Sequence, residues 1–197
     1  MDQDTIIRAV MIVGFLIVVP WAGYYRVRSK TKEKLDRMQE GLFILIGIRL
    51  GGLLSMGGVI VFLISPEFMQ WSAVALPLWL RWTGVALGVC AGVLWIWTFR
   101  HLGKNLTDTV VIRNEHTFIS SGPYRWVRHP FYVVLCSLFI ANSLALGNWF
   151  VFLSGMAVFL LLVIRTKKEE ANLVLRFGSE YSDYMKRVGR FFPKFQK

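Results

Sequence analysis

The sequence predicts an all-α integral membrane bundle of five transmembrane helices, with short helices in a C-terminal tail. Apolar residues make up 55% of the 197 residues and the mean hydropathy is +0.49, an excess that a soluble domain of this length does not need to fill its core. Apolar runs close to the roughly 20 residues that span a bilayer recur along the chain. Basic residues cluster just outside these runs, so the net charge of +11 indicates membrane lipid headgroups as partners, and not nucleic acid.

The five expected crossings follow in order along the chain: residues 6–24, 43–64, 77–99, 131–146 and 149–164. The first run is preceded by Asp2 and Asp4 and not by the basic start of a secretory signal, so we expect it to remain as a permanent helix. The last two runs are short and are separated only by Gly147 and Asn148, which predicts a tight helical hairpin. Glycines recur every four residues in the second and third runs, a spacing that lets helix backbones approach closely: Gly47, Gly51, Gly84, Gly88 and Gly92.

Basic residues orient the predicted bundle. Residues 25–40 hold six Lys and Arg, residues 100–130 hold five, and residues 165–197 hold nine, whereas the connections 65–76 and 147–148 hold none. Cytoplasmic segments carry the Lys and Arg excess of membrane proteins. The sequence therefore predicts an N-terminus outside, a tail inside, and three basic segments on the cytoplasmic side.

A polar and aromatic segment, residues 121–132, stands between the third and fourth apolar runs. His129-Pro130 ends any helix that arrives from upstream, because proline lacks the N–H and disfavours helical geometry in the residue before it. Polar groups at the edge of a membrane helix are costly, so this segment predicts a ligand site. The alternative is that His129 is an ordinary helix-boundary residue and that Tyr124 and Tyr132 are interfacial belt aromatics.

A second polar group, residues 165–170, continues the fifth run without a helix breaker. Arg165 and Glu169 are four residues apart and share a helix face. Its simplest interpretation is a solvated helix end with a weak ion pair. The helix is expected to run to Phe177-Gly178, followed by a short helix over residues 180–188. Arg49, inside the second run, is either a site residue facing the bundle interior or a snorkelling side chain.

Common catalytic patterns for soluble folds do not occur in the sequence. It contains no GxGxxG, no Walker loop, no HExxH and no GxSxG, and its three histidines lack metal-ligand spacing, so no metal site is expected. The remaining interpretation is a membrane bundle with one cytoplasmic polar site, assembled from residues 113–132 and 165–170.

These blocks, SGPYRWVRHPFY, then an apolar hairpin, then RTKKEE, then FGSEYSDYMKRV, together resemble the isoprenylcysteine carboxyl methyltransferase family. The wider group includes membrane phospholipid methyltransferases. The resemblance covers the chain from Asn105 onward, which suggests a division into transmembrane helices in residues 1–104 and a methyltransferase core in residues 105–197. It implies S-adenosylmethionine as methyl donor, with S-adenosylhomocysteine as product.

The resemblance also implies roles for individual residues. Arg165 matches the substrate-side, catalytic arginine of the family. Cofactor-binding positions are matched by His116, Thr117, Phe118, Ile119, Tyr124, His129, Pro130, Phe131, Tyr132 and Glu169. Glu169 suits the cofactor's ammonium or ribose, and His129 with Arg128 suits its carboxylate.

The predicted function is methylation of a carboxylate on a lipid-like acceptor, as in isoprenylcysteine O-methylation. A carboxylate is ionised at neutral pH and needs no general base, but it needs a cation such as Arg165 to position it. The acceptor is expected to enter from the bilayer and the cofactor from the cytoplasm. Lys167 and Lys168 stand where the family is often more acidic, and a phospholipid or other lipid amine N-methyltransferase remains an alternative. A non-catalytic scaffold or transporter is disfavoured, because a transporter would place polar sites and broken helices near the midplane.

Overall fold

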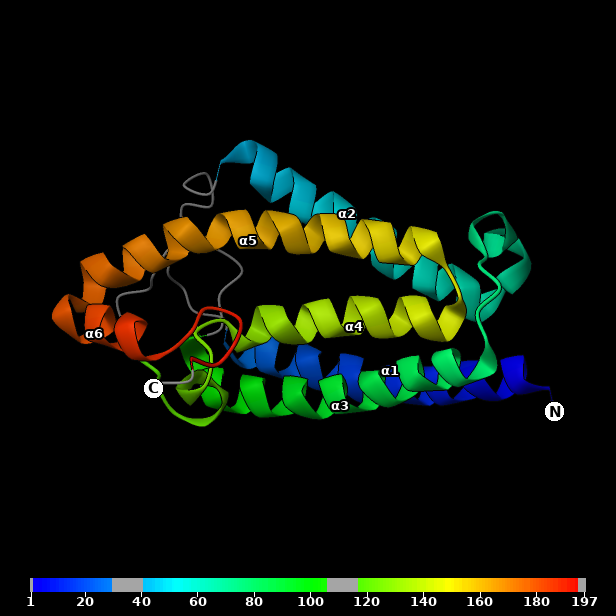
Figure 1. Ribbon diagram of the computed structural model, residues 1–197, viewed down its shortest axis with the longest axis horizontal. Coiled ribbons are helices and arrows are strands. Elements are labelled where there is room, and N and C mark those ends of the chain that lie inside the picture. Colours follow the sequence, from blue (N-terminus) through cyan, green and yellow to red (C-terminus); the bar gives the residue numbers. More distant parts are fainter. Residues whose placement is uncertain (1, 30–40, 106–116, 195–197) are drawn as a thin grey trace.

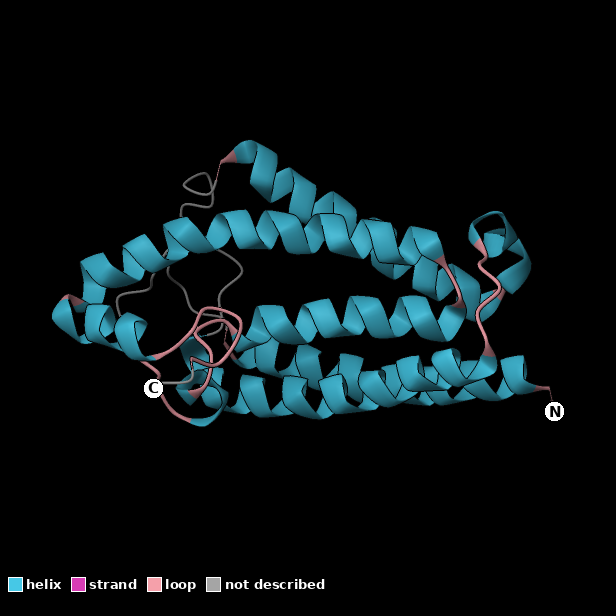
Figure 2. Ribbon diagram, viewed as in Figure 1, coloured by secondary structure: helices cyan, strands magenta, loops and turns pink. Residues whose placement is uncertain are grey.

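The computed structural model describes residues 2–29, 41–105 and 117–194, and every regular element within these ranges is a helix (Figure 2). The elements are α1 (Gln3–Arg28), α2 (Leu42–Ile64), η2 (Pro66–Ser72), α3 (Leu78–Leu102), η3 (Gly103–Asn105), η4 (Gly122–Arg125), α4 (Pro130–Leu146), α5 (Trp149–Phe177) and α6 (Ser179–Arg187). The predicted all-α class is confirmed, as are the continuation of α5 to Phe177 and the short helix after it.

Four of these helices, α1, α2, α3 and α5, are long and apolar enough to cross a membrane, and α4 is a shorter apolar helix of 17 residues. At about 1.5 Å per residue α4 is roughly 25 Å long, somewhat less than the ~30 Å hydrocarbon core of a bilayer. Over its described residues the chain is therefore an all-α membrane protein with four long apolar helices and one shorter one.

The spatial order of the helices differs from their chain order (Figure 1). α1 packs on α3, α3 on α4, α4 on α5, and α5 on α2. Consecutive helices α1 and α2 thus pack against different partners. The N-terminus lies at one end of the bundle with η2, whereas η4, α6 and the C-terminal segment gather at the other end.

Glycines allow the closest approaches between helices. An added Cβ at Gly84 of α3 would lie 2.6 Å from the backbone nitrogen of Ala145 in α4. At Gly51 of α2 it would lie 2.6 Å from Cγ2 of Val158 in α5. These contacts agree with the packing role that the four-residue glycine spacing predicts.

The predicted hairpin between α4 and α5 is confirmed. Gly147 ends α4 in the left-handed conformation with φ 60°, which glycine adopts without a steric penalty. The Asn148 side chain caps α5 by accepting from the Val151 N–H at 3.1 Å, and its amide donates to Ser72 Oγ at 2.7 Å. The hairpin is thereby tied to the connection that follows α2.

Candidate functional site

The polar end of the bundle is built around the start of α4. Pro130 occupies the first position of this helix, where its missing N–H breaks no helical hydrogen bond, and His129 is the N-terminal cap residue. Just before it, Gly122 adopts φ +60°, and an added Cβ there would lie 2.4 Å from the His101 ring of α3. The segment can therefore turn tightly against α3 only because residue 122 lacks a side chain.

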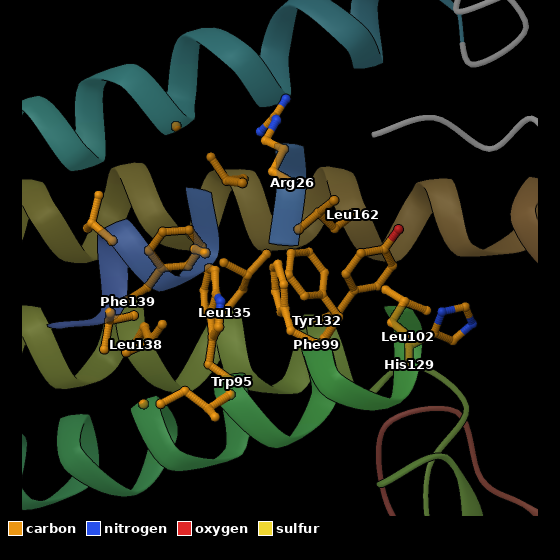
Figure 3. Close-up of a pocket in the computed structure, with 18 of the residues that line it drawn as sticks. Arg26, Trp95, Phe99, Leu102, His129, Tyr132, Leu135, Leu138, Phe139 and Leu162 are labelled. Carbon is orange, nitrogen blue, oxygen red and sulfur yellow. The ribbon is translucent and has the colours of Figure 1, made fainter. Parts of the chain in front are cut away.

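A cavity of about 1660 Å³ begins at this polar end of the bundle, near His129, and extends between the helices (Figure 3). The structure brings most of the sequence-predicted site residues to its wall: Thr117, Phe118, Ile119, Tyr124, His129, Phe131, Tyr132, Arg165 and Glu169. Pro130 is buried at the start of α4 and is not among the described residues of the wall. His116 lies outside the described residues.

Tyr132 and two residues of α5 form the junction between the polar and apolar parts of the cavity wall. The Tyr132 hydroxyl donates to Glu169 Oε2 at 2.7 Å. Arg165 lies one turn earlier on α5, and only 8% of its surface is exposed. Lys167 and Lys168, between them, are exposed. The interpretation of this segment as a solvated helix end therefore holds for the lysines and is wrong for Arg165.

Aromatic side chains from three segments meet at the cavity's polar end. The Phe118 ring lies 5.7 Å from Phe177, 5.8 Å from Tyr181 and 5.2 Å from Tyr184, between ring centroids. The Tyr184 hydroxyl donates to the backbone carbonyl of Tyr124. Burial raises the pKa of Tyr184 to about 12, and burial together with the neighbouring Glu169 holds the pKa of Tyr124 above its usual range. These hydroxyls stay neutral at physiological pH.

Asn105 fixes the start of the segment that carries Phe118. Its side-chain amide donates to the Thr117 carbonyl at 2.9 Å and to Thr117 Oγ1 at 3.0 Å. In return the Thr117 N–H donates to Asn105 Oδ1 at 3.2 Å. A buried amide in η3, directly after α3, thus anchors residues 117–119 beside the cavity.

Sequence reasoning missed the role of Glu170, which follows Glu169 directly. Glu170 is buried and accepts from Arg128 Nε at 2.9 Å, from His129 Nε2 at 3.1 Å and from Arg190 Nε at 3.1 Å. Arg128 also donates to the carbonyl of Met185 at 3.1 Å. Arg128 also lines the cavity, so the expectation that it serves the cofactor's carboxylate stays a prediction, although its Nε and Nη1 groups bind the protein itself.

The C-terminal residues Tyr181 and Tyr184 were also missed. They are three residues apart on α6 and both are buried, although the remainder of this short helix is largely polar. The signal in the sequence was the spacing of these two tyrosines, which places both on one face of an otherwise polar helix and so indicates a buried face.

The chain is similar in sequence to known methyltransferases. The profile of the isoprenylcysteine carboxyl methyltransferase family matches residues 84–175. Human protein-S-isoprenylcysteine O-methyltransferase is 32% identical over 142 residues, covering 64% of this chain and 46% of that protein. Methanethiol S-methyltransferase 2 of Bradyrhizobium diazoefficiens is 25% identical over 142 residues, covering 64% of this chain and 54% of that protein. The chain thus spans about half the length of the curated relatives it matches.

A solved structure supports the fold. The eukaryotic intramembrane Ras methyltransferase ICMT superposes with a TM-score of 0.55 at 24% identity, covering 74% of this chain and 51% of that chain. At this identity the likeness concerns the helical architecture alone.

Proposed function

We propose, from the premise that this chain belongs to the isoprenylcysteine carboxyl methyltransferase family, that it is an S-adenosylmethionine-dependent membrane methyltransferase acting on a carboxylate of a lipophilic acceptor. The cofactor, the acceptor and the orientation in the membrane are all parts of this proposal. Residues 105–197 would carry the cofactor site, and residues 1–104 would supply most of the remaining membrane helices.

The residues at the polar end of the cavity fit the chemistry of S-adenosylmethionine. When bound, this cofactor supplies a methyl group on a sulfonium ion, which is the electrophile of the reaction. The Glu169 carboxylate suits its ammonium or ribose hydroxyls, and the rings of Phe118 and Tyr181 suit its adenine. His129 offers a further polar contact from the start of α4.

The observation that carries the acceptor proposal is the continuity of one cavity from this polar end into apolar surroundings. On the α4 side the wall extends from Tyr132 to Ala145, which at ~1.5 Å per residue corresponds to about 20 Å. Glycines of α1 and α2, Gly14 and Gly52, line the same cavity. A mostly apolar space of this length suits a prenyl or acyl chain, with its polar group held at the cofactor end.

Arg165 is the residue proposed to hold the acceptor's reacting group. Its guanidinium is permanently charged and planar, so it can bind a carboxylate through two parallel hydrogen bonds. Its low exposure of 8% removes competing water and strengthens this interaction. One carboxylate oxygen held in line with the transferring methyl group is enough for displacement, since an ionised carboxylate needs no base.

The relative named methanethiol S-methyltransferase raises a second acceptor class, a small thiol. A cavity of about 1660 Å³ with long apolar walls far exceeds what a one-carbon thiol fills, so we favour the lipophilic acceptor. Lipid amine N-methylation remains the alternative with a lipophilic acceptor, and it would require a group that deprotonates the amine.

The proposed orientation has five crossings, with α4 as the shortest, an N-terminus outside and a cytoplasmic cofactor site. The distribution of Lys and Arg supports it, since segments 25–40, 100–130 and 165–197 carry the basic excess. The acceptor would enter from the bilayer between α1 and α2, because residues of both helices line the cavity while α1 packs on α3 and α2 packs on α5.

A three-way acceptor comparison tests this proposal. The purified protein in lipid nanodiscs receives labelled S-adenosylmethionine with an N-acetyl-S-prenylcysteine, with an ethanolamine phospholipid, or with methanethiol. We expect label transfer to the prenylcysteine compound. Transfer only to the phospholipid or only to the thiol would replace carboxyl methylation by the corresponding reaction.

A further inference from the structure

The C-terminal strap, defined as residues 188–194, packs against the start of α4 through residues 189–191, and its last three residues are exposed. The Arg128 N–H donates to the Gly189 carbonyl at 2.9 Å, and the His129 N–H donates to the Arg190 carbonyl at 3.1 Å. Gly189 permits a tight turn here, because an added Cβ would lie 1.8 Å from the carbonyl oxygen of Phe192. Gly189 and Arg190 of the strap therefore pair in parallel with the backbone of residues 127–129.

A buried carboxylate joins the strap to the membrane helices. The Glu170 side chain of α5 is 4% exposed, and both of its oxygens accept hydrogen bonds from Arg190 of the strap. Arg128, 7% exposed, donates to the same carboxylate and to the carbonyls of Met185 and Val188 at the end of α6. Removal of one partner from a buried group of charges leaves the others uncompensated and strongly destabilises the arrangement.

The same carboxylate sets the orientation of the His129 ring. A carboxylate only accepts, so Nε2 of His129 carries the proton in its 3.1 Å contact with Glu170, and Nδ1 is the nitrogen left for other partners. The ring stacks on Tyr132 at 5.3 Å with an interplanar angle of 4°, and Phe191 of the strap lies 5.9 Å away. Tyr132 in turn donates to Glu169.

Glu170, Arg190 and Phe191 are not among the described residues of the cavity wall, whereas His129, Tyr132 and Glu169 are. We infer that Glu170 and the C-terminal strap are positioning elements of the methyltransferase site, which act on the cofactor through His129. The inference rests on the proposed function, since it assigns to that site residues that do not line the cavity.

Binding of S-adenosylhomocysteine, measured by calorimetry on the full-length protein in detergent, tests this inference. Glu170→Gln and Arg190→Gln should each weaken binding roughly tenfold or more, as expected when a charge-assisted contact is lost. Arg190→Lys should restore part of the affinity, because it keeps the charge without the two-point contact. Lys186→Gln is the matched control: this cation of α6 is 77% exposed, forms a surface ion pair with Asp183, and its loss should leave binding unchanged.

A double-mutant cycle separates positioning from general destabilisation. If Arg190 acts through His129, the loss from Arg190→Gln should largely disappear once His129 is replaced by alanine. Wild-type-like binding in both Arg190→Gln and Glu170→Gln, or a loss that adds fully to that of His129→Ala, would overturn the inference. Should Glu170→Gln fail to fold, the Arg190 variants decide alone, since that side chain is 35% exposed at the rim. Failure of the wild-type protein to bind S-adenosylhomocysteine would instead refute the proposed function.

Discussion

A leucine at Gly52 should narrow the cavity that we assign to the acceptor chain. Gly52 lies within α2, it lines the cavity, and an added Cβ would meet nothing within 4 Å. Leucine also favours a helix more than glycine does, by about 0.8 kcal/mol per residue, so the substitution should not weaken the helix. The variant therefore changes the occupied volume of the cavity without an obvious cost to folding.

The size of the effect follows from the volume taken. The four carbons of a leucine side chain would displace two or three methylene groups of a bound chain, each worth about 0.8 kcal/mol. The expected loss is about 2 kcal/mol, or roughly 30-fold in kcat/KM for a long acceptor. Affinity for the cofactor should not change, because the proposed cofactor contacts come from residues 117–119, η4, α4, α5 and α6, and none comes from α2.

The assay compares kcat/KM for prenylcysteine analogues of increasing chain length, with labelled S-adenosylmethionine at saturation. Gly14→Leu, on α1, should act as Gly52→Leu does, since Gly14 also lines the cavity with open space around it. Gly57→Leu is the matched control: Gly57 belongs to the same helix and also has open space, but it is outside the described cavity wall. Equal losses for Gly52→Leu and Gly57→Leu, or equal losses for long and short acceptors, would refute the assignment of the cavity to the acceptor.

Further predictions concern orientation, cofactor and acceptor. In a cysteine-free background, Glu67→Cys and Lys186→Cys should be labelled from opposite sides of the membrane; labelling from one side would contradict the proposed topology. Glu169→Ala should weaken cofactor binding by roughly 10- to 150-fold, the loss of a charge-assisted contact of about 1.5–3 kcal/mol, and unchanged binding would argue against its role. Arg165→Ala and Arg165→Lys should both lower turnover strongly while cofactor affinity changes little; near-normal turnover in either would remove Arg165 from the acceptor site. Turnover should be nearly constant between about pH 7 and 9, since an acceptor carboxylate stays ionised and burial keeps the pKa of Tyr184 at about 12; a steep rise with pH would indicate an amine acceptor.

Much of the fold was predictable because apolar length and helix breakers are local signals. The runs ending near Ile64 and Leu146 and the stop at Phe177 correspond to observed helix ends. The pairing of α2 with α5 was not predictable, because both helices are apolar around much of their circumference and glycine spacing does not identify the partner helix.

The predictable part of the site consists of residues whose types are unusual at the edge of a membrane helix. Tyr124, His129 and Tyr132 stood out for that reason, and the structure brings them to one cavity. Glu169 and Glu170 could not be separated, because neighbouring helix positions differ by about 100° and the rotation of α5 is set by packing. The strap escaped prediction because a short irregular segment has no periodicity to read.

The position of the transferred methyl group in the product is the most direct test of the proposed reaction. After incubation of the wild-type protein with labelled S-adenosylmethionine and a prenylcysteine acceptor, the extracted product is treated with mild base and the volatile label is counted. A methyl ester should release its label as methanol, and Arg165→Ala should strongly reduce that signal. Label that remains bound to the extracted product after base treatment, as an N-methyl or S-methyl group would, contradicts carboxyl methylation.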